Sequence, residues 1–421
     1  MSSERSILNN LAVLIAFFLF LSFASGTANA LDTSGLFGGG NYVHPFISLD
    51  TVWSDNIYET HDNKESDTIV YTRPGIWFAL PGADRQIISL ETASESPGGT
   101  TLTRFNDNEM VRYQTYLLYT PEFENYLDQT DHNEINHKAE GYFLYNFPGG
   151  LSFELLDQYV VSHDDIVEGE DNLTYANNYL SPTLSFSPTE KLQFRVDYSL
   201  YDVNYDSQAD VKDRVDSTVS AYVFFKIMPK TSLFFQYYNT DIDYDNTTDT
   251  LKSIDSTEEG YLLGIKWDIT DKTTGIYKAG YQSKDFDGSG YDDTTSLKME
   301  LKANYDLTSR SSISLTEKNE FTETDEDNAY YIHTNTLLMV YEQSLTERFT
   351  GFLGLSYIHE DYGELDRKDV TFDISPSLAY TYNDLLTFNA AYTFENVRSK
   401  GTADVEDYRK NSILLSVSAS L

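Results

Sequence analysis

Charged side chains recur at alternate positions of segments whose intervening positions are apolar. Arg195 and Asp197, for example, alternate with Phe194, Val196 and Tyr198. Alternate side chains of a β-strand lie on the same face of a sheet, so each such segment has one charged face and one apolar face. The residues expected on the charged faces are Arg195, Asp197, Lys226, Lys266, Asp268, Lys278, Lys298, Glu300, Lys302, Asp373 and Glu395.

These rows of mixed charge permit two arrangements. Around a water-filled lumen they are typical of a pore lining, because opposed charges set up a transverse field that orders small solutes. In a narrow lumen they instead form ion pairs with one another and fill the space. The sequence leaves both alternatives open.

A short acidic segment resembles the first half of a calcium-binding loop. Asp285, Asp287 and Asp293 supply oxygen donors at the spacing of such a loop, and Gly290 occupies the position of its sharp turn. Ser296 stands where the loop needs a bidentate glutamate. We therefore expect at most a weakly bound calcium ion here, with a solvated turn as the alternative, and no other cofactor.

Nothing in the sequence predicts catalysis. It has no cysteine and seven histidines, and no two of these have metal-binding spacing on one face. His132 and His137, five positions apart, are expected on opposite faces of one continuous strand. Ser162, His163 and Asp164 are consecutive, and adjacent strand residues point apart, so they form no catalytic triad. We expect no enzymatic activity.

The composition excludes several classes of protein. The 421 residues carry a net charge of -38, from 29 basic and 67 acidic side chains. This sign excludes a nucleic-acid-binding protein that works through a basic surface. Low mean hydropathy with high charge would indicate disorder, but disordered chains are poor in aromatic residues, and 14% of this sequence is aromatic. An ordered, polar, aromatic-rich architecture is required.

The amino terminus predicts export. Arg5 precedes an apolar run at 11–23, and Ala28 and Ala30 provide the small residues that signal peptidase recognises. We expect a signal peptide at 1–30 and one mature domain at 31–421, with an uncleaved anchor as the alternative. The apolar run is short for a transmembrane helix, and the expected location is a Gram-negative outer membrane.

The mature sequence consists of alternating segments of about 9–14 residues, a length that spans a bilayer when strands are tilted. Short turns such as 148–150, 188–191 and 229–230 recur every 36–42 residues, and Pro81 to Asp84 is expected to be another. Between them lie longer acidic connections, at 164–171, 241–249, 284–293, 323–328 and 360–368.

Short turns at one end and long polar loops at the other are typical of a transmembrane outer-membrane antiparallel β-barrel. A soluble propeller repeats at a similar interval, but its strands are shorter. We expect an all-β fold of about 18 strands, in the range 16–20, because 85–137 holds either one or two hairpins. The final strand, 413–421, resembles the segment that the barrel-assembly machinery recognises, although it ends in Leu421 rather than Phe.

A family resemblance is carried by the stretch 54–76. Ser54-Asp55-Asn56-Ile57, then Ser66-Asp67-Thr68-Ile69 and Pro74-Gly75-Ile76, resemble the opening of the putative beta-barrel porin-2 family. This resemblance implies an outer-membrane barrel, in a family often encoded beside exopolysaccharide and exosortase genes. It implies a role in polysaccharide export and supplies no catalytic residues.

Two functional hypotheses follow. The first is a porin-like channel that serves as a conduit in exopolysaccharide export. The alternative is a structural or adhesive barrel with a plugged lumen and acidic external loops that bind cations. Expected partners are outer-membrane lipid and lipopolysaccharide, the barrel-assembly machinery, and polysaccharide or small solutes. Aromatic side chains are expected on outward faces and most of the acidic excess in the long loops.

Overall fold

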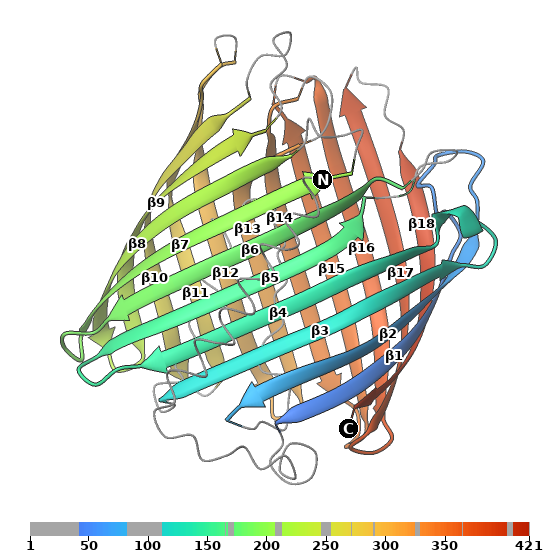
Figure 1. The fold of residues 1–421 in the computed structure, drawn as a ribbon, viewed down its shortest axis with the longest axis horizontal. Coiled ribbons are helices and arrows are strands. Elements are labelled where there is room, and N and C mark those ends of the chain that lie inside the picture. Colours follow the sequence, from blue (N-terminus) through green and yellow to red (C-terminus); the bar gives the residue numbers. More distant parts are fainter. Residues whose placement is uncertain are drawn as a thin grey trace.

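The computed structural model describes residues 42–81, 112–164, 166, 172–206, 213–245, 254–270, 272–288, 291–324, 329–363, 365–401 and 407–420. They form one closed antiparallel barrel of 18 strands (Figure 1). The predicted signal peptide lies outside this range. No helix in the described part is long and apolar enough to cross a membrane.

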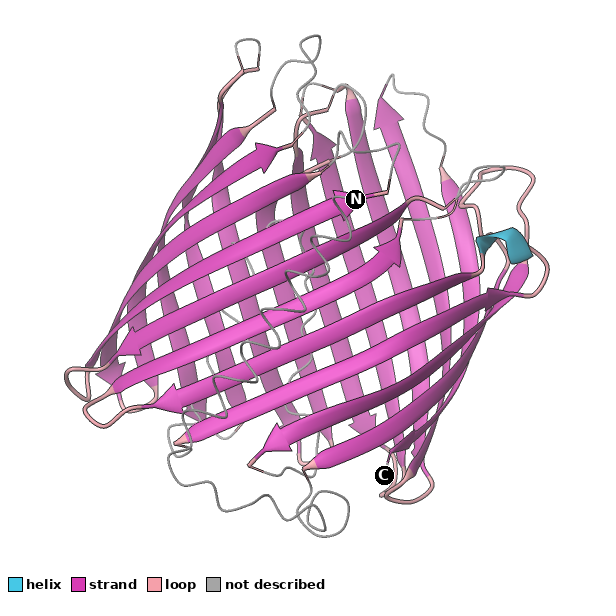
Figure 2. Cartoon of the chain, in the orientation of Figure 1, coloured by secondary structure: helices cyan, strands magenta, loops and turns pink. Residues whose placement is uncertain are grey.

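The strands follow one another in sequence order around the barrel, as the colours of Figure 1 show. Figure 2 shows the strands in magenta and, in cyan, the one short 3-10 helix of the described residues, at Thr130–His132. Their bounds are β1 Val43–Ser54, β2 Asp67–Leu80, β3 Tyr113–Tyr126, β4 Glu134–Asn146, β5 Leu151–His163, β6 Thr174–Phe186, β7 Leu192–Tyr205, β8 Arg214–Met228, β9 Thr231–Tyr244, β10 Ser256–Thr270, β11 Thr273–Phe286, β12 Thr294–Thr308, β13 Ser311–Thr322, β14 Ile332–Ser344, β15 Phe349–Tyr362, β16 Arg367–Thr381, β17 Leu386–Gly401 and β18 Tyr408–Ser420.

The first and last strands close the barrel. β1 pairs with β18 in an antiparallel register that runs from Phe46 opposite Ser420 to Ser54 opposite Ser412. A bilayer core offers no water to unpaired backbone groups, so a spanning sheet must have no open edge. This pairing supplies the closure, and the predicted fold class is confirmed.

The strand count matches the prediction, and one predicted turn lies largely outside the described residues. Of the short turn expected at Pro81 to Asp84, only Pro81 is described; β2 ends at Leu80, and the next described strand, β3, begins at Tyr113. The ambiguous interval 85–137 therefore contributes β3 and the start of β4. The sequence between Leu80 and Tyr113 has the composition of a turn at its start and no strand alternation to mark where the chain returns.

The strands are also longer than predicted, from 12 residues in β1 to 16 in β17. Segments predicted as acidic loops, such as 241–244 and 284–286, continue β9 and β11. Beyond the bilayer both faces of a strand are polar, so hydrophobic alternation stops before the strand does. The predicted loops consequently began too early.

The outward face carries an apolar band and then a polar rim. Along β7, Phe194, Val196 and Tyr198 are exposed to the surroundings of the barrel, and Asp202 and Asn204 follow on the same face nearer the long-loop end. On β10 the same order holds, with Leu263 and Tyr261 exposed and Glu259 and Thr257 nearer the long-loop end. A membrane-spanning barrel needs this pattern, because the lower positions meet lipid and the upper positions meet water and headgroups.

Three outward prolines interrupt the ladder on one side only. Pro74, Pro182 and Pro376 pair with β1, β5 and β15, while the pairing of β2 with β3, β6 with β7 and β16 with β17 is broken at these positions. Proline has no N–H to donate, so the break falls on the side where the donor would point. The irregular pairing at these prolines therefore follows from their missing donor.

A charge in the apolar band tests the outward assignment. Leu263, at the middle of β10, is 69% exposed on the outward face. We expect Leu263→Arg to lower the free energy of unfolding in lipid vesicles by about 2–4 kcal/mol, as for cations near the bilayer midplane. Thr257→Arg, on the same face in the polar rim, should cost about 1 kcal/mol or less. Equal losses, measured by urea unfolding, would contradict the assignment.

Candidate functional site: the inner wall of the barrel

The inner wall brings together five of the residues predicted to line a pore. Arg195 and Asp197 on β7, Lys278 on β11, and Lys298 and Glu300 on β12 are buried on inward positions. Their burial arises from ion pairing and packing along the wall. Whether the charged wall lines an open pore stays a prediction.

The remaining predicted residues lie closer to water. Lys226 is exposed near the short-turn end of β8, while Lys266, Lys302, Asp373 and Glu395 are half-buried on their inward faces. The side chain of Asp268 lies outside the part of the chain that the structure describes.

On β7 the charges form an intrastrand pair. Arg195 Nε lies 2.6 Å from Asp197 Oδ1, and the guanidinium lies 5.8 Å from the ring centre of Tyr222. Positions i and i+2 of a strand share a face, which places the two charges side by side. The pair is 1–3% exposed, so each ion depends on the other for compensation.

Strands β11 and β12 carry a second group. Lys278 stands directly opposite Glu300 in the register, and their Nζ and Oε2 atoms are 2.9 Å apart. Lys278 also donates to Gln236 Oε1, and Lys298 donates to the Tyr238 hydroxyl at 3.2 Å. The wall of β9, β11 and β12 is therefore tied together by side-chain bonds.

A third group of buried charges, which the sequence did not predict, lies near the long-loop end. Lys284 Nζ lies 3.2 Å from Glu258 and 2.5 Å from Glu323, and Tyr244 donates its hydroxyl hydrogen bond to Glu323. Arg214 on β8 pairs with the neighbouring Asp216. The sequence predicted a loop at Lys284. In the structure Lys284 lies on β11, an even number of positions from Lys278 and Gln282, and therefore shares their inward face.

Glu323 follows the end of β13 and contacts both Lys284 and Tyr244 of this group. Burial by itself raises the pKa of its carboxyl, but the charges of Lys284 and Arg214 outweigh burial and hold the pKa below its ordinary value. Glu323 is therefore an anion at neutral pH. Glu323 and Glu258 both contact the buried ammonium group of Lys284 and compensate its charge.

A fourth group joins β1, β2 and β3. Arg73 on β2 bridges Asp50 on β1 and Glu122 on β3. Glu124 accepts hydrogen bonds from Tyr71 and Tyr126. These contacts cross the strands beside the β1–β18 junction and brace the wall where the sheet closes.

Buried charges on the inner wall nearly balance. Among the described residues, ten carboxylates and seven Lys or Arg side chains are buried. An excess of three carboxylates is small beside the net charge of -38. The buried carboxylates are those of Asp67, Glu124, Glu140, Asp197, Asp216, Glu258, Glu300, Glu320, Glu323 and Asp369, and the buried cations are Arg195, Arg214, Lys278, Lys284, Lys298, Lys318 and Arg367.

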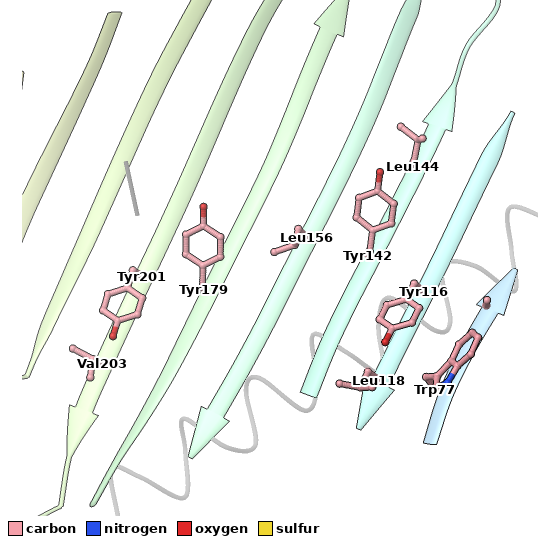
Figure 3. Packing of buried hydrophobic residues seen from close by; sticks show 10 residues of the cluster. Trp77, Tyr116, Leu118, Tyr142, Leu144, Leu156, Tyr179, Tyr201 and Val203 are labelled. Carbon is pink, nitrogen blue, oxygen red and sulfur yellow. The ribbon is translucent and has the colours of Figure 1, made fainter. Parts of the chain in front are cut away.

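Aromatic side chains also cover this wall, which corrects the expectation that they lie on outward faces. Figure 3 shows Trp77, Tyr116, Tyr142, Tyr179 and Tyr201 on neighbouring strands, in one buried cluster with aliphatic residues. On the polar inward face, a tyrosine ring packs against apolar neighbours while its hydroxyl group can make a hydrogen bond. Alternation alone therefore assigned too many aromatic residues to the lipid.

The opposite wall is different in kind. The inward positions of β15–β18 are half-exposed over most of their length, and many of them carry small side chains. Buried inward side chains on the described parts of these four strands occur only near the long-loop end, at Tyr362, Arg367 and Asp369. Val340 on the inward face of β14 is 42% exposed. The small inward residues include Gly354, Ser356, Ser375, Ser377, Ala379, Ala391, Thr393, Ser412, Ser416 and Ser418.

The described residues of the predicted calcium loop do not form a group of metal ligands. Asp285 lies on the outward face of β11, Asp287 follows the strand, and Asp293 accepts a hydrogen bond from the Phe286 N–H. Across the described strands and connections, no three His, Asp or Glu side chains are placed to hold a metal ion. Gly290 of the predicted loop lies outside the described residues, and weak calcium binding stays a prediction.

The histidines are dispersed, and one expectation about them is wrong. His132 lies in the 3-10 helix and not on a strand with His137, because the chain turns between β3 and β4. His163 contacts Glu124 at 3.1 Å and the backbone oxygen of Asp164. It is thus held by hydrogen bonds at the end of β5.

Comparison with known proteins places these features in context. A family model described as putative beta-barrel porin 2 matches residues 125–421, a match that does not include the stretch 54–76. No curated protein matches the sequence.

Similar solved structures are outer-membrane barrels of low sequence identity. OccAB4 of Acinetobacter baumannii has a TM-score of 0.47 and 10% identity, with 91% of this chain and 99% of that chain covered. OccK2 of Pseudomonas aeruginosa has a TM-score of 0.46 and 10% identity, with 90% and 98% covered. The siderophore receptor PirA of Pseudomonas aeruginosa has a TM-score of 0.43 and 7% identity, with 90% and 80% covered.

Removing Lys284 tests the energetic role of the paired charges. We expect Lys284→Met to lower the free energy of unfolding by about 3–5 kcal/mol, because Glu258 and Glu323 would remain buried without their cation. Lys226→Met removes an exposed cation from the same inner face, and it should change stability by about 0.5 kcal/mol or less. Urea unfolding in vesicles that shows equal losses for the two variants would refute the pairing argument.

Proposed function

Because the chain belongs to the family described as putative beta-barrel porin 2, we propose that this outer-membrane barrel is a porin-like channel. We place it in the outer membrane of a Gram-negative bacterium, where barrels of this kind occur. Members of a porin family conduct solutes rather than transform them, and we infer no enzymatic activity for this chain.

One observation carries the proposal. Many inward side chains of β15–β18 are small, and most are half-exposed, whereas most inward side chains of β7–β12 are buried and include large and charged groups. An 18-stranded barrel is wide enough for its interior to hold more than side chains. Solutes would pass along the small-residue wall, in the field of the charged wall opposite.

A hydroxyl-rich wall also supports the finer proposal of a conduit in exopolysaccharide export. Ser356, Ser375, Thr393, Ser412 and Ser416 present short hydroxyl side chains that donate and accept hydrogen bonds. A sugar chain exchanges such bonds among equivalent partners as it moves. The resemblance to a family encoded beside exopolysaccharide genes points to the same solute class.

The packing of the charged wall favours the alternative of a structural barrel with a plugged lumen. Lys278 and Lys284 are fully enclosed among their partners. If similar packing extended across the lumen, no solute would pass. Conductance separates the two proposals.

Adjacent residues of β18 provide a matched test. Ser416 faces inward, opposite Asn389 and Asp50, while Leu415 faces outward and is 58% exposed. We expect discrete ion steps from the native protein in planar bilayers. Ser416→Trp should lower the step size by roughly twofold or more because it narrows the pore.

Leu415→Trp, which adds the same ring to the lipid-facing side, should leave the step size unchanged. Absence of steps from correctly folded native protein would overturn the channel proposal and leave the plugged barrel. Export of polysaccharide is tested separately, by deleting the gene in its host and measuring surface polysaccharide; an unchanged amount would refute that finer proposal.

A further inference from the structure

Basic side chains on the described strands point inward far more often than outward. On the described strands, Lys and Arg residues occupy inward positions with four exceptions. These exceptions are Lys368 on β16, Arg398 and Lys400 on β17, and Arg409 on β18. All four lie at the long-loop ends of three adjacent strands, and we call them the basic sector.

The outward rim elsewhere has the opposite sign. From β7 to β15, the charged residues at outward positions near the long-loop end are acidic, apart from histidine. These residues are Asp202, Asp241, Asp243, Glu259, Asp285 and Asp361. The basic sector therefore interrupts a rim that is otherwise acidic or neutral.

The register holds the four cations close together. Lys368 stands directly opposite Lys400, and Arg398 is the next outward residue of β17. Arg409 stands opposite Asn396, which lies two positions from Arg398. Like charges directly opposite one another destabilise a strand pair, so this arrangement favours a bound anion.

Nearby acidic groups compensate the sector only in part. Asp361 pairs with the exposed Lys368 at 2.5 Å. Asp407 accepts a hydrogen bond from the Ser399 N–H, and Asp55 accepts two from Asn411. The Arg409 guanidinium donates to the neutral amide of Asn396 at 3.1 Å. These contacts leave exposed guanidinium and ammonium donors on the outward surface.

The sector lies immediately beyond the lipid-facing band. Phe372 on β16, Phe394 on β17 and Ile413 on β18 are outward residues between the cations and the short-turn end. Phe372 and Ile413 are among the exposed hydrophobic residues. A molecule bound here would meet donors at one end and an apolar surface at the other.

We propose that the basic sector binds the phosphate headgroup of an anionic lipid in the outer leaflet. Arg and Lys are the side chains suited to phosphate, and arginine can contact two of its oxygens at once. The acyl chains of the same molecule cover Phe372, Phe394 and Ile413. The site is on the outside of the barrel and is independent of conduction through the lumen.

Diphosphoryl lipid A in phosphatidylcholine vesicles provides the probe. The native protein, reconstituted in these vesicles, should bind a fluorescent lipid A in preference to phosphatidylcholine. Arg398→Gln with Lys400→Gln should weaken binding about tenfold or more, since each cation near an anionic surface contributes a factor of roughly five. Lys266→Gln with Lys302→Gln removes the same charge from inward positions and should leave binding unchanged.

Further measurements separate the other occupants and control for folding. Arg398→Lys with Arg409→Lys keeps the charge and should retain binding within about threefold, whereas a loss equal to that of the glutamine variant would refute a phosphate site.

Inorganic phosphate should not displace lipid A; displacement would show a site for free phosphate instead. If the glutamine variant only changed the oligomeric state, the sector would be an interface between copies, and the lipid proposal would fail. Heat-modifiable electrophoretic mobility confirms that each variant is folded.

Discussion

Closure of the backbone hydrogen-bond ladder is the constraint on which the rest of this structure depends. In a bilayer, an unpaired strand edge leaves N–H and C=O groups without water. Pairing of β1 with β18 removes that edge, and it joins segments from opposite ends of the described chain. Once the sheet is closed, every strand has one face toward lipid and one toward the lumen, and each residue's position in the alternation decides its surroundings.

The inward faces then divide into two walls with different physical properties. The charged wall satisfies its ions internally, as in Lys278 with Glu300 and Arg195 with Asp197. Buried aromatic rings of Tyr222, Phe224 and Phe234 lie on the strands between these pairs. The wall of β15–β18 has little side-chain volume and no comparable packing among its described residues. This asymmetry allows a wide barrel to be rigid on one side and solvated on the other.

Alternation predicted the closed barrel and its number of strands because lipid imposes a strict two-residue period on outward positions. It also placed Lys278, Lys298 and Glu300 on one face. It failed for Lys284 and for Trp77, since polar faces accept lysine, tyrosine and serine alike, and nothing in the sequence states which inward residues meet one another. Those pairings depend on the register between strands, such as Lys278 opposite Glu300, which the structure supplies.

The central claim is that one inward wall is solvated and the other is packed, and the absence of cysteine makes it directly measurable. The experiment places single cysteines at Ser416 and Ser356 on the small-residue wall, and at Ser199 and Ser220 on the charged wall. Each folded variant in vesicles is then treated with a water-soluble, membrane-impermeant thiol reagent. Ser416→Cys and Ser356→Cys should react readily, whereas Ser199→Cys and Ser220→Cys, at buried positions, should react at least about tenfold more slowly because buried thiols are inert. Equal reaction rates at all four positions would contradict the account.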